Sequence, residues 1–232
     1  MLLRKAFAEL IGSLLLAATV VGSGIAAQRL SPHDVGLQLL ENSVVTGAAL
    51  VALILALGPV SAAFNPVVTL AERLLGAVTT RAAAVFIAAQ VVGCCAGTIL
   101  ANLMFELPAV DLSSRHRSSA GLWLGEVVAT FGLVVVIFGV VRAGRGRQVA
   151  FAVGGYITAA YWFTSSTSFA NPAITIGRAL SDTFAGIAPA SVPMFVLMQL
   201  LGGLLAVGAA LLLYPDAGRV ADDLTHLESS VD

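Results

Sequence analysis

The sequence predicts an all-α membrane protein with six transmembrane helices and two re-entrant half-helices, arranged as an inverted 3+3 repeat. Three observations lead to this fold class. The 232 residues are 58% hydrophobic and only 11% charged, with a mean hydropathy of +0.95, whereas soluble domains carry about 25% charged residues. An Asn-Pro helix start interrupts the apolar sequence twice, at Asn65-Pro66 and at Asn171-Pro172. Matching polar residues also recur in the two halves of the chain.

The composition also argues against several functions. A net charge of −1 provides no basic surface for nucleic acid. We find no nucleophile–base pair, phosphate-binding loop or metal-ligand spacing, and therefore expect no enzyme, no cofactor and no metal site. Cys94 and Cys95 are adjacent in an apolar stretch, where small core residues are more common than disulfide partners or ligands.

The N-terminal apolar run needs a choice between a secretory signal and a first span. Arg4-Lys5 and the small residues before Gln28 fit a signal peptide. The run is long for a signal, however, and it contains Glu9. We therefore predict a transmembrane helix over residues 6–28.

The remaining spans follow from apolar stretches of about 20 residues separated by polar loops. We predict them over residues 37–57, 80–103, 120–141, 149–164 and 192–213. The chain is expected to form a single membrane domain over residues 1–232. Its first repeat covers about 6–103, its second about 120–213, and a polar tail occupies 215–232.

The two Asn-Pro sites predict half-helices over about 66–75 and 172–184. Asn is a favoured N-cap, and Pro fits the first helical position because it has no N–H to leave unpaired. Helices that begin at membrane depth cannot face lipid, since their first N–H groups would lack partners. Both half-helices should therefore line a cavity, with their positive dipole ends directed into it.

Glutamate and glutamine positions show that the halves are repeats. Glu9 in the first span corresponds to Glu126 in the fourth, and Gln90-x-x-Gly in the third corresponds to Gln199-x-x-Gly in the sixth. Three spans per repeat give the copies opposite topology. The functional site is then expected near the midplane, between the repeats.

Orientation follows from the positions of Lys and Arg. The two sides of the predicted topology carry eight and four of these residues, and the richer side should be cytoplasmic. This places both termini in the cytoplasm of a bacterial inner (plasma) membrane. The richer side has Arg4, Lys5, Arg73, Arg81, Arg142, Arg145, Arg147 and Arg219, and the other has Arg29, Arg115, Arg117 and Arg178.

Together these motifs resemble the major intrinsic proteins, the aquaporins and aquaglyceroporins, from Ala8 to about Leu213. The resemblance implies a right-handed six-helix bundle with a pore through each subunit, assembled as a homotetramer in the lipid bilayer. It also implies water and small neutral solutes as permeants. The pore centre would be formed by Asn65, Pro66, Val67, Asn171, Pro172 and Ala173, with Val67 standing where the family usually has Ala.

Within this family fold, the two asparagines and the two glutamates have expected roles. Each Asn oxygen caps its own half-helix, which should leave the amide N–H free to donate to a water or polyol oxygen. The donors and dipole ends should also exclude cations and interrupt proton conduction. Glu9 and Glu126 should be buried acceptors for backbone N–H groups of the re-entrant loops.

This chain differs most from the family at the selectivity filter, which is the narrowest point of the pore. An Arg usually follows the second Asn-Pro-Ala, but Ile174 stands there. The other three positions of this selectivity filter map to Thr46, Ala159 and Ser168; counting without a gap would give Val45 instead of Thr46. The predicted filter has no aromatic ring, His or Arg. Arg178, one helical turn further, is interpreted as a structural or mouth residue.

The predicted function is a passive channel for small uncharged solutes: water, glycerol-like polyols and trivalent arsenicals such as arsenite or methylarsenite. A filter without Arg resembles the aquaglyceroporins associated with bacterial arsenic resistance. A water-selective aquaporin is one alternative. A proton-coupled secondary transporter that uses Glu9, Glu126 and Glu41 is another, because intramembrane carboxylates are often functional.

Overall fold

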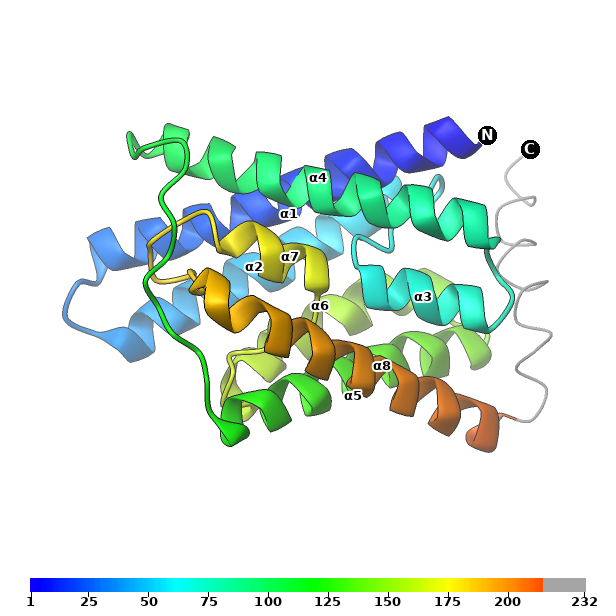
Figure 1. Cartoon of the computed structure of the whole chain (residues 1–232). Helices are drawn as coiled ribbons and strands as arrows, with labels where there is room; N and C mark the ends of the chain where they lie inside the picture. Colours follow the sequence, from blue (N-terminus) through cyan, green and yellow to red (C-terminus); the bar gives the residue numbers. More distant parts are fainter. Residues whose placement is uncertain (215–232) are drawn as a thin grey trace.

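The computed structural model describes residues 1–214, and it places six long helices around two short ones (Figure 1). The tail 215–232, with Arg219, lies outside the described residues. Within residues 1–214 there are helices and loops but no strand. The long helices are α1 (Leu2–Leu30), α2 (Val35–Leu57), α4 (Thr80–Met104), α5 (Ala120–Arg142), α6 (Val149–Phe163) and α8 (Val192–Leu213).

Five of these helices, α1, α2, α4, α5 and α8, are long and apolar enough to cross a membrane. α6 occupies the position of the predicted fifth span but has only 15 residues, preceded by a 3-10 turn at Gly146–Gln148. The start of α1 and the end of α8 lie at the same end of the bundle (Figure 1). Because the long helices alternate in direction, loop 143–148 lies at this end and loop 105–119 at the other, which we call the outer end.

Small residues bring the helices of each repeat together. α1 packs along α4, and α5 packs along α8. A Cβ at Gly93 of α4 would lie 2.4 Å from the carbonyl oxygen of Leu10, and one at Gly202 of α8 would lie 2.5 Å from that of Val127. The Gln-x-x-Gly motif therefore supplies a backbone-to-backbone crossing in both halves.

The half-helices α3 (Pro66–Leu74) and α7 (Pro172–Arg178) enter the bundle from opposite ends and meet in its middle (Figure 1). The Asn65 side-chain oxygen accepts from Val67 N, and that of Asn171 accepts from Ala173 N and Ile174 N. Both N-caps and the Pro at each first turn agree with the prediction. Each half-helix thus directs the positive end of its dipole to the centre.

The second half-helix is shorter than predicted, because it ends at Arg178 rather than near residue 184. Ala179 N and Leu180 N make tight bonds to the carbonyls three residues earlier. The Leu180 carbonyl then accepts from Asp111 N and from Asn102 Nδ2. Tertiary hydrogen bonds therefore replace the helix after Arg178.

Candidate pore

Glu9 fixes the first re-entrant loop. Its carboxylate, fully buried, accepts from Ala63 N at 2.9 Å and Phe64 N at 2.7 Å, and also from the hydroxyl of Ser61. Gln90 Nε2 donates to the same carboxylate at 2.8 Å. A carboxylate that accepts four hydrogen bonds holds the loop backbone without a metal or a cation.

Glu126 holds the backbone of the second re-entrant loop in the same way. It accepts from Phe169 N and Ala170 N, both at 2.9 Å, and from Gln199 Nε2 at 2.6 Å. The backbone contacts predicted for both glutamates are present. In each repeat the glutamine also donates to a threonine of the half-helix, Thr69 or Thr175. The polar contacts of the two halves are therefore copies of each other.

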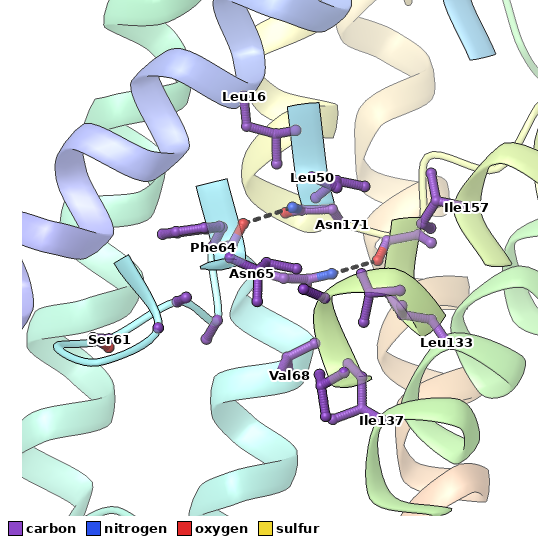
Figure 2. Close-up of a pocket in the computed structure, with 18 of the residues that line it drawn as sticks. Leu16, Leu50, Ser61, Phe64, Asn65, Val68, Leu133, Ile137, Ile157 and Asn171 are labelled. Atoms are coloured by element: carbon purple, nitrogen blue, oxygen red, sulfur yellow. Dashed lines mark hydrogen bonds between the residues drawn. The ribbon is translucent and has the colours of Figure 1, made fainter. Parts of the chain in front are cut away.

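The residue before each central asparagine has a left-handed backbone. Phe64 has φ of 48° and Ala170 has φ of 49°, which is uncommon outside glycine and costs free energy. Asn171 Nδ2 donates to the Phe64 carbonyl, and Asn65 Nδ2 donates to the Ala170 carbonyl, each at 2.7 Å (Figure 2). The loops of the two repeats thus bind each other reciprocally.

These bonds correct the expectation that the asparagine amides are free donors. One N–H of each amide is used by the carbonyl of the opposite loop. An amide nitrogen carries two hydrogens, so one N–H per asparagine remains for another acceptor. Asn65 and Asn171 are both buried, and both line the central cavity.

The central cavity has a volume of about 860 Å³ and runs through the bundle from Arg4 and Lys5 at one end to Arg178 at the other. Most of its wall is apolar around the two asparagines (Figure 2). The aliphatic residues of this wall include Leu16, Val20, Leu50, Val68, Leu133, Ile137, Val153 and Ile157.

Three of the four predicted filter residues line this cavity: Thr46, Ser168 and Ile174. All three are buried. Val45, the alternative to Thr46, is 43% exposed and does not line the cavity. The hydroxyl of Ser168 has no hydrogen-bond partner within residues 1–214 and can serve a solute.

The prediction that Ala159 is the fourth filter residue is wrong. This residue lies on an exposed face of α6 and does not line the cavity. Ile157 and Tyr161 of the same helix do line it, and the Tyr161 hydroxyl lies 3.3 Å from Thr46 Oγ1. The buried positions Val153, Ile157 and Tyr161 recur every four residues, a helical period that could have identified Tyr161 from the sequence.

The outer end of the cavity is also more cationic and aromatic than predicted. Arg178 is 2% exposed, lines the cavity, and donates through Nε to the Ala185 carbonyl. Its guanidinium carbon lies 3.4 Å from the centroid of the Phe169 ring, and Phe169 lines the cavity too. Arg178 therefore has both a structural contact and a place at the cavity wall, although Ile174 occupies the expected arginine position.

The cysteines lie away from the cavity. Cys94 is buried and Cys95 half-buried, and both are free thiols. Cys94 packs beneath α7, where a Cβ at Gly177 would lie 2.8 Å from the Cys94 carbonyl oxygen. In the part of the chain that the structure describes, no group of three or more His, Cys, Asp or Glu side chains could hold a metal ion.

Six long helices around two half-helices, joined at a cavity by their asparagine caps, define a membrane channel. The model of the major intrinsic protein family matches residues 1–149, and the chain belongs to this family. It is 50% identical to "Aquaglyceroporin AqpS" of Rhizobium meliloti (strain 1021) over 207 residues, which cover 89% of this chain and 88% of that protein.

One more distant relative and one solved structure support the same family and fold. "Aquaporin A" of Dictyostelium discoideum is 30% identical over 187 residues, or 75% of this chain and 67% of that protein. The X-ray structure of the aquaglyceroporin from Plasmodium falciparum matches with a TM-score of 0.73, covering 94% of this chain and 99% of that chain. At 18% identity this likeness shows the fold, and it confirms the predicted class with its paired half-helices.

Proposed function

We propose that the chain is a passive channel that conducts water, glycerol-like polyols and trivalent arsenicals through the central cavity. The observation that carries the proposal is the 860 Å³ cavity with Asn65 and Asn171 at its middle. Each asparagine keeps one N–H to donate to a passing oxygen. The positive ends of α3 and α7 lie behind these donors and disfavour cations.

The character of the wall supports solutes that carry several hydroxyls on an apolar frame. Aliphatic side chains line most of the cavity, while Thr46, Tyr161 and Ser168 offer hydroxyls near its outer end. A polyol can place its carbon face on the aliphatic wall and its oxygens on the polar groups. The name of the Rhizobium relative, an aquaglyceroporin, favours the same solute class.

Ile174 is the residue that extends the proposal to trivalent arsenicals. Trivalent arsenite is neutral near pH 7 and carries hydroxyls like a polyol, so the same wall suits it. An aliphatic Ile174 in place of the usual arginine removes one fixed positive charge from the cavity wall. This favours larger neutral solutes over a selectivity for water alone.

The two buried glutamates support a channel rather than a proton-coupled transporter. Glu9 and Glu126 are fully buried, bind the loop backbones, and do not line the cavity. A proton relay through these two residues would need both carboxylates in contact with the translocation path. We assign both residues the task of holding the loops.

We further propose that the channel is a homotetramer in a bacterial inner membrane, with the end that carries Arg4 and Lys5 in the cytoplasm. The excess of basic residues at that end supports this orientation. Large apolar side chains on the outer faces of α2, α4 and α8 are exposed in the single chain. Lipid and neighbouring subunits would cover them. Native mass spectrometry of the purified channel tests the assembly.

The experiment that tests the function is stopped-flow light scattering on reconstituted vesicles, with water, glycerol and a trivalent arsenical compared in the same preparation. We expect rapid entry of all three, with solute flux linear in concentration. Fast water flux without solute flux would favour the water-selective alternative. Saturable flux that requires a pH gradient would favour the transporter. Vesicles no more permeable than empty ones would contradict a channel of either kind and the transporter as well.

A further inference from the structure

A second, smaller pocket lies at the outer end of the molecule, beside the central cavity. Its volume is about 200 Å³. Arg178 lines both this pocket and the cavity, so the two spaces meet at its side chain. The other lining residues are Val35, Leu39, Asn42, Arg115, Arg117, Thr167 and Phe184. Three arginines from two separate segments of the chain thus converge on one small space.

None of these three guanidinium groups forms an ion pair with a carboxylate within residues 1–214. Arg178 donates to the Ala185 carbonyl, and Arg117 Nε donates to the Gly186 carbonyl at 3.0 Å. Backbone carbonyls therefore satisfy only part of each five-donor group. Several N–H donors on Arg117 and Arg178 remain for another acceptor.

Arg117 and Arg178 are held close to each other. Their guanidinium carbons lie 5.0 and 3.4 Å from the centroid of the same Phe169 ring, so their separation cannot exceed the sum of these distances. Arg178 is almost fully buried, and Arg117 is half-buried. Two like charges so close, with one out of water, repel each other unless an anion offsets them.

The nearby carboxylates are occupied elsewhere. Glu126 binds Phe169 N and Ala170 N, and its charge reaches the arginines only at longer range. Asp182 is exposed and bonded to Ser114, whose backbone N–H is the main reason that its pKa lies below the usual range; the charge of Arg115 lowers this pKa further but by less. Burial, followed by the charge of Arg115, lowers the pKa of Arg117 to about 10. The cluster therefore keeps an excess of positive charge.

We propose that this pocket is a binding site for a small oxyanion, held by Arg115, Arg117 and Arg178 at the outer mouth of the channel. Guanidinium groups bind carboxylate and phosphate oxygens in pairs of parallel hydrogen bonds. A volume of about 200 Å³ accommodates a tetrahedral anion with several waters of about 30 Å³ each. Aromatic and aliphatic walls from Phe184 and Leu39 would limit the site to compact anions.

This inference does not rest on the identity of the conducted solute, because the pocket lies beside the central cavity rather than within it. Inorganic phosphate is the probe, and isothermal titration calorimetry of the full-length channel in detergent, at fixed ionic strength, is the measurement. We expect saturable binding in the wild type. Arg115→Gln should weaken it about tenfold, the loss expected for a hydrogen bond to a charged group.

Arg115 is the residue to change because it is exposed, so its loss is compatible with folding. Arg29→Gln is the matched control: Arg29 is also an exposed arginine at the outer end, but it contacts Phe105 and does not line the pocket. Phosphate affinity should be unchanged in this variant. Absence of saturable binding in the wild type, or equal weakening in both variants, would overturn the proposal.

Discussion

Each central asparagine has three separate contacts available through one short side chain. Its oxygen caps its own half-helix, one N–H holds the opposite loop, and the second N–H is left for another acceptor. Only a carboxamide combines an acceptor with two donors in this shape. The side chain therefore cannot be replaced by a close analogue without losing at least one of these contacts.

Asn65→Asp should make the channel leak cations and also reduce its stability. The carboxylate still caps α3, but it places negative charge against the Ala170 carbonyl in place of a donor. We expect a loss of about 1–3 kcal/mol in stability and a rise in cation conductance, measured by thermal unfolding and planar-bilayer recording. Asn102→Asp is the control, since Asn102 is also buried and donates to two carbonyls but does not line the cavity. It should lose stability without conducting ions; equal conductance in both variants would contradict the role of Asn65.

Ile174→Arg should restrict the channel to smaller permeants. The new guanidinium would fill the wall beside Thr46 and Ser168 with a hydrated charge. We expect glycerol entry to fall about tenfold, equivalent to about 1.4 kcal/mol in the barrier, with water entry affected less. Stopped-flow measurements on vesicles give both rates, and Ile174→Leu serves as the apolar control. An unchanged ratio of glycerol to water flux would remove Ile174 from the filter.

Single residues at the outer end were predictable only where a rigid element fixes their direction. Ile174 and Ser168 are tied to the Asn-Pro-Ala start, and Thr46 follows the buried period of α2. The choice of Ala159 rests on the family's filter positions and not on the pattern of α6 itself. The buried face of α6 carries Ile157 and Tyr161, and Ala159 lies on its exposed face.

At the scale of elements, the re-entrant loops are held by buried carboxylates. Glu9→Gln would place an NH2 group against donors that include Phe64 N and Gln90 Nε2. We expect a loss of about 1.5–3 kcal/mol, seen as a lower melting temperature in detergent. Glu106→Gln, at an exposed loop position, should have no effect. If the two variants melt alike, Glu9 does not hold the loop.

The crossing of α1 and α4 depends on glycine. Gly93→Ala would drive a methyl group into the Leu10 carbonyl and separate the helices, at a cost of about 1–3 kcal/mol. Gly208→Ala in α8 meets nothing within 4 Å and should be neutral. Thermal unfolding of both variants tests this, and a neutral Gly93→Ala would mean that the helices can adjust their separation.

Helix starts were easier to predict than helix ends. Both half-helix starts follow from Asn-Pro, because capping is encoded by adjacent residues. The end of α7 at Arg178 depends on Asn102 and Asp111, which bind the Leu180 carbonyl from distant parts of the chain. No local pattern contains that information. The same holds for the arginine pocket, whose members come from separate segments.

At the scale of the whole molecule, the property to test is the orientation of the chain in the membrane. With Cys95 replaced by Ala, an impermeant maleimide applied to intact cells should label His116→Cys and not Ala143→Cys. Both positions are exposed, in loops at opposite ends of the bundle. Permeabilised cells should label both, which controls for reactivity. The reverse pattern in intact cells would place the N-terminus outside.

The reciprocal bonds between the two loops also set an order for biogenesis. Phe64 receives its donor from a residue 107 positions later, and Asn65 finds its acceptor 105 positions later. While the ribosome is still synthesising α5, the centre of the first repeat therefore has a carbonyl and an amide without partners. Because such groups are costly in lipid, we expect the first half-helix to settle at its final depth only after α7 has been translated.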